Sequence, residues 1–435
     1  MPSDHPLLLE LTAHAAAVAH QAPHHSTCPC GAATLADRPD GTVVRHGDTV
    51  AKAHAKDADP GELKARMETA TQLKGIFVAP LTPAPTHLHG RPVTFWPYGV
   101  PVDPDTPDAA PWEPAATLLA HLHRTPAPPN LPVMRGPLKA ARAITRLRAE
   151  APEHPATAPV LRAWSTLPAW ARAEAPMSGP PTLCHGDFHL GQLVHLPSGG
   201  GWRLIDVDDL GVGHPAWDLA RPAAWFACGL LHGEEWARFL AAYRNAGGTA
   251  VPADGDPWPF LDTPARALTV QTAARMITKA VADGRTLDDV ETCVVDACAR
   301  IASAKTPPAP APSPLGCNRR GPDGVCPGDT RSRTDRRGAE QTMQCPKCRA
   351  PMHTYNRNGV QIEQCSGCRG IFLDYGELEA LTRLEAQWSQ PAPPAAPQAY
   401  PAAPQAPAAP AWGAPHGGHY GHRRHKSFGH MLFSS

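Results

Sequence analysis

The feature that most constrains the fold of this chain is a proline-rich break near residue 305. Five prolines fall between Thr306 and Pro314, and a segment of this composition forms an extended spacer rather than part of a packed core. The 435 residues therefore divide into a first body of about 300 residues, long enough to bury a sizeable core, and shorter elements that follow the break.

The first body alternates apolar runs with turns, and its strands come before most of its helices. This order predicts an α+β fold of two lobes, which we divide into an N-lobe at residues 1–94 and a C-lobe at residues 95–304. The segments that we expect to be strands are Thr42–Ala55 around a Gly47-Asp48 turn, Pro180–Leu196 and Gly201–Gly211. Gly90–Gly99 is an apolar segment that ends in a turn. The segments that we expect to be helical are Gly61–Leu73, Glu113–Arg124 and most of 217–304.

Polar residues gather at the ends of two apolar strands of the C-lobe. Asp187 and Gln192 lie in one loop, and Asp206 follows the next strand. Phosphoryl transfer needs one carboxylate to orient the attacking hydroxyl, and it needs a second carboxylate and an amide to hold Mg²⁺ against the nucleotide phosphates. These three residues meet that need.

The ordered set His185-Gly186-Asp187, Gln192, Asp206 and Gly213 to Asp218 resembles the aminoglycoside phosphotransferase superfamily over about residues 35–300. The resemblance implies a protein-kinase-like fold of two lobes that uses ATP and Mg²⁺. It implies that Asp187 is the catalytic carboxylate and that Gln192 and Asp206 bind Mg²⁺. His185 would brace the catalytic loop, and Asp218 would brace the helix that follows.

The same resemblance assigns residues to the nucleotide site. Lys52 takes the place of the strand lysine that holds phosphates, and either Glu62 or Glu68 would pair with it. Trp96 and Tyr98 fall where the hinge of the family holds adenine. Most members carry Asn where this chain has Gln192, so the amide oxygen is kept on a side chain longer by one methylene.

Two pairs of cysteines follow the break. Cys345 and Cys348 are separated by 16 residues from Cys365 and Cys368, which falls within the spacing of a four-cysteine zinc site. Four thiolates satisfy tetrahedral Zn²⁺, and a unit of about 45 residues needs metal binding to fold. We therefore predict a zinc-binding unit at residues 343–388. It contains a hairpin with an Asn358-Gly359 turn between the cysteine pairs, a strand after the second pair and one helix that begins after Asp374.

This unit resembles the transcription-factor-IIB-type zinc ribbons of small bacterial proteins. Its basic and acidic residues balance, as they do in the whole chain with 40 of each, and a neutral surface binds phosphate backbones poorly. We therefore expect no nucleic-acid partner, and a protein partner for the zinc ribbon is an alternative that the sequence leaves open.

The remaining segments carry weaker signals. Residues 305–342 and the Pro/Ala-rich and His-rich tail at 389–435 have no hydrophobic period, and we expect both to be disordered. The Cys28-Pro29-Cys30 segment lies near several histidines, but the spacing closes no metal site. The chain lacks a long apolar run and a basic N-terminal leader, so we expect a cytoplasmic protein with reduced thiols and no membrane contact.

The sequence thus predicts an ATP-dependent phosphotransferase that acts on a hydroxyl of an aminoglycoside-, sugar- or amino-alcohol-like molecule and carries a tethered zinc ribbon. The alternative is a catalytically silent kinase fold that presents the zinc ribbon to a protein or a nucleic acid.

Overall fold

The computed structural model describes residues 6–20, 30–38, 40–106, 109–177, 179–180, 182–197, 199–304, 345, 347–357, 360–368, 371–372 and 408–414. The predictions for residues 305–342, for the Asn358-Gly359 turn, for the helix after Asp374 and for most of 389–435 lie outside these residues. The described residues up to Ala304 and those at 408–414 form one compact unit, and those from Cys345 to Phe372 form another.

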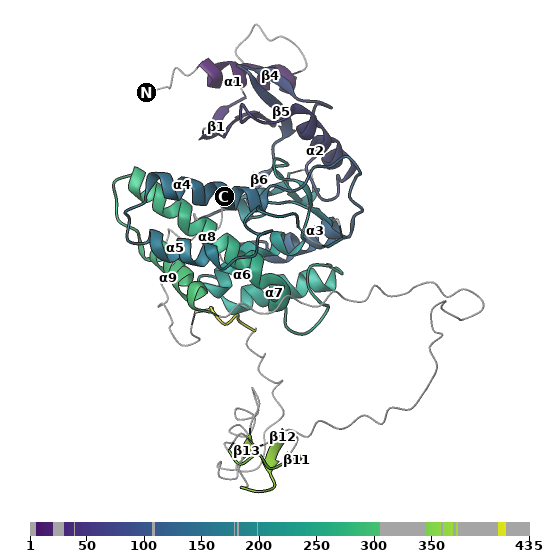
Figure 1. Cartoon of the computed structure of the whole chain (residues 1–435). Coiled ribbons are helices and arrows are strands. Elements are labelled where there is room, and N and C mark those ends of the chain that lie inside the picture. Colours follow the sequence, from purple (N-terminus) through teal and green to yellow (C-terminus); the bar gives the residue numbers. More distant parts are fainter. Residues whose placement is uncertain are drawn as a thin grey trace, which may run out of the picture. The chain divides into compact units, whose positions relative to one another are not determined.

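The N-lobe is an antiparallel sheet with the strand order β1-β2-β3-β5-β4 (Figure 1). Its strands are β1 (Ala32–Arg38), β2 (Gly41–His46), β3 (Thr49–His54), β4 (Thr86–Leu88) and β5 (Arg91–Pro97). The predicted hairpin is confirmed, because β2 pairs with β3 across a turn in which Gly47 has a φ of 56°. Strand β5 extends past residue 94, so the sheet runs beyond the predicted end of this lobe.

Two helices flank this sheet, α1 (Pro6–His20) and α2 (Pro60–Gln72). Helix α1 buries Leu7, Leu8 and Leu11 against apolar side chains of β2, β3 and β5. Helix α2 begins at Asp59, whose carboxylate accepts hydrogen bonds from the backbone N–H groups of Gly61 and Glu62, which leaves fewer backbone donors unpaired.

The C-lobe is mainly helical, as the sequence predicted. Its helices are α3 (Trp112–Arg124), α4 (Gly136–Glu150), α5 (Thr157–Ser165), α6 (Ala216–Ala227), α7 (Gly233–Asn245), α8 (Trp258–Ala282) and α9 (Asp289–Ser303). Helix α8 packs against α4, α6 and α9, and α3 packs against α7. Apolar side chains of all these helices form one continuous buried core.

Short strands on this helical body carry the polar loops. They are β6 (Val100–Pro101), β7 (Thr182–Cys184), β8 (Leu193–Leu196), β9 (Gly201–Leu204) and β10 (Gly211–Gly213). Strand β7 pairs with β10, and β8 lies between β6 and β9. The loop after β7 and the loop after β9 are thereby held beside each other, because Ile205 N–H donates to the Gln192 carbonyl at 2.9 Å.

Residues Ala408–Ala414 differ from the prediction of a disordered tail, because they pack against the helical lobe. The Trp412 side chain is 1 % exposed, and its indole Nε1 donates to Asp262 Oδ1 of α8 at 2.8 Å. Arg300 of α9 donates to the Trp412 carbonyl at 2.9 Å, and Trp258 Nε1 donates to the Ala408 carbonyl at 2.6 Å. A buried indole with a partner for its N–H explains why this proline-rich stretch is held in place.

The second unit holds β11 (Met352–Arg357), β12 (Val360–Cys365) and β13 (Ile371–Phe372), which form one antiparallel sheet in chain order. The predicted hairpin after the first cysteine pair is confirmed by the register of β11 against β12. In the described part of the chain, no helix combines the length and the apolar character needed to cross a membrane.

Candidate active site and zinc centre

A cavity between the two lobes collects five of the residues singled out in the sequence. Its lining includes Lys52 of β3, Trp96 of β5, Tyr98, Gln192 and Asp206. Strand β1 also contributes to the lining of the cavity. A partly apolar cleft with a few converging charged groups is the usual form of a small-ligand site.

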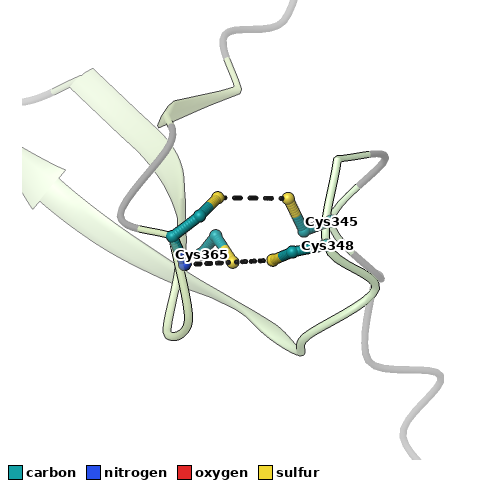
Figure 2. A group of neighbouring side chains, drawn as sticks. Cys345, Cys348 and Cys365 are labelled. Carbon is teal, nitrogen blue, oxygen red and sulfur yellow. Dashed lines mark hydrogen bonds between the residues drawn. The ribbon is translucent and has the colours of Figure 1, made fainter.

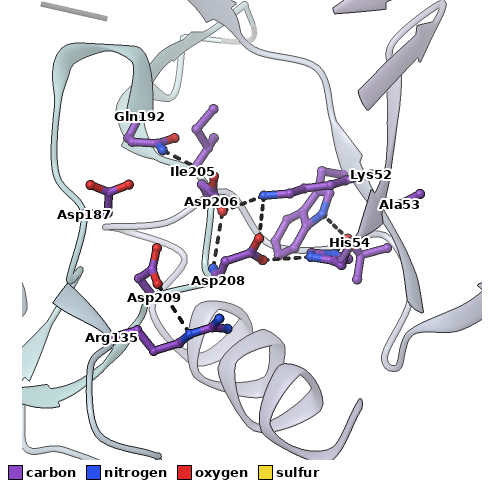
Figure 3. A network of polar contacts seen from close by, with 12 residues as sticks. Lys52, Ala53, His54, Arg135, Asp187, Gln192, Ile205, Asp206, Asp208 and Asp209 are labelled. Carbon is purple, nitrogen blue, oxygen red and sulfur yellow. Dashed lines mark hydrogen bonds and ion pairs between the residues drawn. The ribbon is translucent and has the colours of Figure 1, made fainter. Parts of the chain in front are cut away.

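Asp206 and Lys52 meet across this cavity, at 2.7 Å between Lys52 Nζ and Asp206 Oδ1 (Figure 3). Lys52 Nζ also lies 3.0 Å from Asp208 Oδ2. Burial alone would lower the pKa of Lys52, but the two carboxylates outweigh it and raise that pKa well above its ordinary value. Asp206 has a φ of 64°, a conformation that costs a non-glycine residue energy and is frequent at functional sites.

Gln192 lies on the same side of the cavity as Asp206, and the Gln192 amide is 3.3 Å from Asp206 Oδ2. Figure 3 shows both side chains directed to the same space. A carboxylate and an amide oxygen are the hard oxygen ligands that Mg²⁺ takes, so the residues present fit this ion. Gln192 and Asp206 are the residues that would hold it.

Neither glutamate that was expected to pair with Lys52 does so. Glu62 pairs instead with Arg66 at 3.1 Å, and Glu68 pairs with Lys64 at 3.4 Å. Both pairs join residues four positions apart on α2, which is the spacing at which helical side chains meet. The carboxylates of Asp206 and Asp208 take the place of the predicted glutamate beside Lys52.

Asp187 is held by two cations that the sequence analysis missed. Lys139 Nζ of α4 lies 2.6 Å from Asp187 Oδ2, and Arg221 Nη2 of α6 lies 2.9 Å from Asp187 Oδ1. Burial works to raise the pKa of Asp187, but the charges of Lys139 and Arg221 overcome it and hold that pKa far below its ordinary value. Asp187 is therefore an anion with both oxygens hydrogen-bonded.

Lys139 also reaches a second carboxylate, that of Asp209, at 2.8 Å. Asp209 is in turn 3.8 Å from the Nε of Arg135. Burial raises the pKa of Asp209. No role was predicted for the segment that holds Arg135 and Lys139. The one signal in the sequence is a helical period with basic residues on one face.

The loop that carries Asp187 is tied to α6 through Asp218, which is fully buried. The Asp218 carboxylate accepts hydrogen bonds from the backbone N–H groups of His185 at 2.6 Å and Gly186 at 2.8 Å. The side chain of His123 adds a contact of 3.0 Å to the same carboxylate. Asp218 therefore ties the loop before Asp187 to α6, the helix that it was predicted to brace.

His185 lies beside this loop with its ring buried. Its Nε2 is 2.9 Å from the Ile205 carbonyl, one residue before Asp206, and its ring stacks on Phe77 with centroids 6.0 Å apart. The ring therefore connects the loop of Asp187 with the loop of Asp206. This contact keeps the two carboxylates in one geometry.

The zinc unit brings its four cysteines together. The sulfur atoms of Cys345 and Cys368 lie 3.7 Å apart, and those of Cys348 and Cys365 lie 3.3 Å apart (Figure 2). Zinc–sulfur bonds of about 2.3 Å in a tetrahedron place sulfur atoms about 3.8 Å apart, so the four residues fit Zn²⁺. The backbone N–H of Cys368 is the largest of the effects that lower the pKa of Cys365 to about 6, which favours the thiolate that binds metal.

Comparison with known families gives two matches. The model of the phosphotransferase enzyme family matches residues 38–261, which is more than half of the chain. The model of the transcription factor zinc-finger family matches residues 344–384. A search of curated proteins finds no match.

Several solved structures are similar to this chain at low identity. A microcompartment-associated aminopropanol kinase is 18 % identical over 67 % of this chain and 97 % of its own, with a TM-score of 0.47. A choline/ethanolamine kinase family protein from Mesorhizobium loti is 18 % identical over 68 % and 94 %, with a TM-score of 0.44. An ethanolamine kinase from Plasmodium vivax is 11 % identical over 69 % and 89 %, with a TM-score of 0.46.

Proposed function

Because this chain belongs to the phosphotransferase enzyme family, we propose that Asp187, Gln192, Asp206 and Lys52 carry out phosphoryl transfer from ATP to a hydroxyl of a small molecule. The fold is two-lobed and kinase-like, the cofactors are ATP and Mg²⁺, and a zinc ribbon follows in the chain. The observation that supports this most strongly is the convergence of Lys52, Gln192 and Asp206 on one cavity. Asp187 lies in the loop that leads to Gln192.

In this proposal Asp187 orients the acceptor hydroxyl and accepts its proton as the oxygen bonds to the γ-phosphorus of ATP, while the bond from that phosphorus to the bridging oxygen breaks and ADP leaves. The transition state of phosphoryl transfer is stabilised mainly by positioning and by charge. An ionised Asp187 suits this role because it can accept a hydrogen bond from a hydroxyl at any ordinary pH. Arg221 then holds the carboxylate in place from the side of α6.

Gln192 and Asp206 would bind Mg²⁺, which supplies positive charge against the phosphate oxygens when it is bound. Lys52 would move from the carboxylates of Asp206 and Asp208 to the phosphates of the nucleotide, because Lys52 and Asp206 line the same cavity. Trp96 and Tyr98 would hold the adenine ring. The Trp96 indole is oriented by its hydrogen bond to Thr94 Oγ1 at 2.8 Å, and Arg45 lies 3.4 Å from the centre of the Tyr98 ring.

The charges beside Asp187 narrow the class of acceptor. Lys139, Arg135 and Arg221 supply three cations to the two carboxylates of Asp187 and Asp209. An ammonium group of a polycationic aminoglycoside would meet Lys139, Arg135 or Arg221 beside Asp187, and a close like-charge contact costs several kcal/mol. A sugar-like acceptor, neutral or with an anionic group, fits the site best.

A kinase assay with ATP, Mg²⁺ and a panel of hydroxyl compounds tests this proposal. The panel should pair neutral and acidic sugars with aminoglycosides and amino alcohols. We expect turnover with a member of the first group, and we expect Asp187→Asn to lower kcat at least about a hundredfold with little change in the affinity for ATP. Nucleotide binding without turnover on any class of acceptor would instead support the silent kinase fold that presents its zinc ribbon to a partner.

A further inference from the structure

Three residues of the N-lobe from separate segments bring metal-binding atoms together, far along the chain from the zinc ribbon. His20 is the last residue of α1, Cys30 lies shortly before β1, and His46 ends β2. One ligand atom from each lies within 4.8 Å of the other two. The two Nε2 atoms of His20 and His46 are 3.2 Å apart, with the rings almost perpendicular at 87°.

The backbone around Cys30 and His46 is fixed by the sheet. His46 faces Ala32 of β1 and Thr49 of β3 in the strand register. The N–H of Gly47 donates to the carbonyl of Gly31 at 3.1 Å, which holds the chain beside Cys30 against the hairpin turn. A Cβ at Gly47 would lie 3.5 Å from the Cys30 sulfur, so the sulfur lies directly over this turn.

The placement of His20 has a different cause. Helix α1 buries Leu7, Leu8 and Leu11 against the same sheet, and this packing sets the axis of the helix over β2 and β3. His20 then arrives at the end of β2 because it closes the last turn of α1. The three residues meet as a consequence of sheet pairing and helix packing, which no spacing in the sequence expresses.

The geometry points to a transition-metal site of the zinc type, and we propose that His20, Cys30 and His46 bind Zn²⁺ in the N-lobe. Zinc–nitrogen bonds of about 2.05 Å place two nitrogen ligands of a tetrahedron about 3.3 Å apart, close to the 3.2 Å between the two Nε2 atoms. Two imidazoles and a thiolate are ligands that zinc prefers over magnesium or calcium. Three protein ligands leave one position for a water molecule.

The burial of His46 supports a role for its ring beyond packing. His46 is 7 % exposed, and its Nδ1 meets no hydrogen-bond partner among the residues that the structure describes. A buried imidazole nitrogen without a hydrogen-bond partner is unfavourable, and an apolar residue would avoid this cost. Coordination through Nε2 leaves the proton of the ring on Nδ1, so the metal bond has to outweigh the cost of this unpaired N–H.

The site lies at the start of the strand that covers the nucleotide cavity. Leu35, Ala36 and Arg38 of β1 line that cavity, and in the described sheet β1 pairs with β2 alone. A metal bond to Cys30 would fix the beginning of β1 to α1 and β2. Bound zinc would therefore strengthen nucleotide binding, a consequence that rests on the nucleotide site proposed above.

Zinc content of the full chain tests the site. The protein is equilibrated with buffered Zn²⁺, desalted and analysed for metal by mass spectrometry. We expect one equivalent for the zinc ribbon and one more for the N-lobe, and we expect Cys30→Ser and His20→Gln each to lose the second equivalent. His14→Gln on the exposed face of α1 and Cys293→Ser on α9 serve as matched controls that keep both.

Cobalt spectroscopy separates the N-lobe from the ribbon. In a full chain with both Cys345 and Cys348 changed to serine, added Co²⁺ should still give a thiolate-to-cobalt absorption band. Cys30→Ser in this background should abolish the band. Two results together would overturn the site. The parent protein would bind a single zinc that is lost with the ribbon cysteines, and the Cys345→Ser/Cys348→Ser protein would show no thiolate-to-cobalt band. His20 and His46 would then form only a hydrogen-bonded pair.

The coupling to nucleotide has its own measurement. ATP affinity in the presence of Zn²⁺ should weaken about fivefold in Cys30→Ser, the lower end of the usual range for coupled sites, and the His14→Gln control should match the parent. Equal ATP affinity in Cys30→Ser and the parent would overturn the coupling between zinc binding and nucleotide binding. The existence of the zinc site is tested separately by the metal analysis. Failure of all proteins to bind ATP would instead contradict the proposed function.

Discussion

Lys139 donates a hydrogen bond of 2.6 Å to Asp187, although 48 residues separate them in the chain. The lysine comes from α4, and the carboxylate lies in the loop after β7. Their contact means that the negative charge proposed for catalysis is already paired with a cation before any substrate binds. It also means that the ionisation of Asp187 depends on a residue outside every motif from which the active site is proposed.

Removing this lysine should make activity sensitive to acid. Burial raises the pKa of Asp187 and the two cations lower it, so Lys139→Met leaves Arg221 alone against burial and the pKa rises. A carboxylate with a lowered pKa stays ionised at every pH above it. We expect the kcat of the parent to show no loss from Asp187 between about pH 5 and 8, whereas the kcat of the variant falls below about pH 6.

The control for this prediction is Lys139→Arg, which keeps the charge and should keep the flat profile. The measurement is kcat against pH with a saturating acceptor. Superimposable profiles for the parent and Lys139→Met would show that Arg221 alone sets the ionisation of Asp187.

Gly186 should not accept even a methyl group. Its φ is 87°, and a Cβ there would lie 2.3 Å from the carbonyl oxygen of Asp209. We expect Gly186→Ala to lower the free energy of unfolding by about 1–3 kcal/mol and to lower kcat about a hundredfold, because displacement of Asp187 by about 1 Å is enough for such a loss.

Thermal unfolding and kcat of the same preparation check this prediction. Gly75→Ala is the matched control, because a Cβ at Gly75 would have no neighbour within 4 Å. A Gly186→Ala protein with the stability and kcat of the control would contradict the close approach of the two loops.

The segment at 408–414 should stabilise the helical lobe. Trp412→Ala removes a buried indole, and we expect it to lower the free energy of unfolding by about 3 kcal/mol. Trp412→Phe keeps most of the apolar surface but leaves Asp262 without its N–H donor, for a loss of about 1 kcal/mol. Denaturant unfolding of the full chain measures both, and values for Trp412→Ala within error of the parent would mean that the segment does not hold the lobe.

The local motifs predicted the part of the active site that short stretches of sequence contain. Asp187 and Gln192 share one loop, and Asp206 follows the next strand, so their order and spacing in the sequence predict that they lie close together. The cysteines of the zinc ribbon were predictable for the same reason, because each pair lies within one turn of the chain. The fold class followed from the order of strands and helices.

The partners of these residues could not be predicted in the same way. The sequence suggested Glu62 or Glu68 as the ion-pair partner of Lys52, because both glutamates lie on the next helix. In the structure, both form ion pairs within α2 instead. The site gains Lys139 and Arg221 only when α4 and α6 pack against each other's neighbours in the helical lobe, and it gains Asp208 from the loop after β9. Which ion pairs form depends on where the backbone delivers each charge, and that is a property of packing.

The sequence by itself determined the residue types, the two ordered bodies and the chemistry of each motif, since these depend on neighbours close in the chain. The tertiary structure alone decided which cations hold Asp187, how Trp412 returns to the helical lobe, and that His20, Cys30 and His46 meet. These contacts join segments that are distant in sequence. Their energies come from burial and close approach, which exist only once the helices and the sheet have packed.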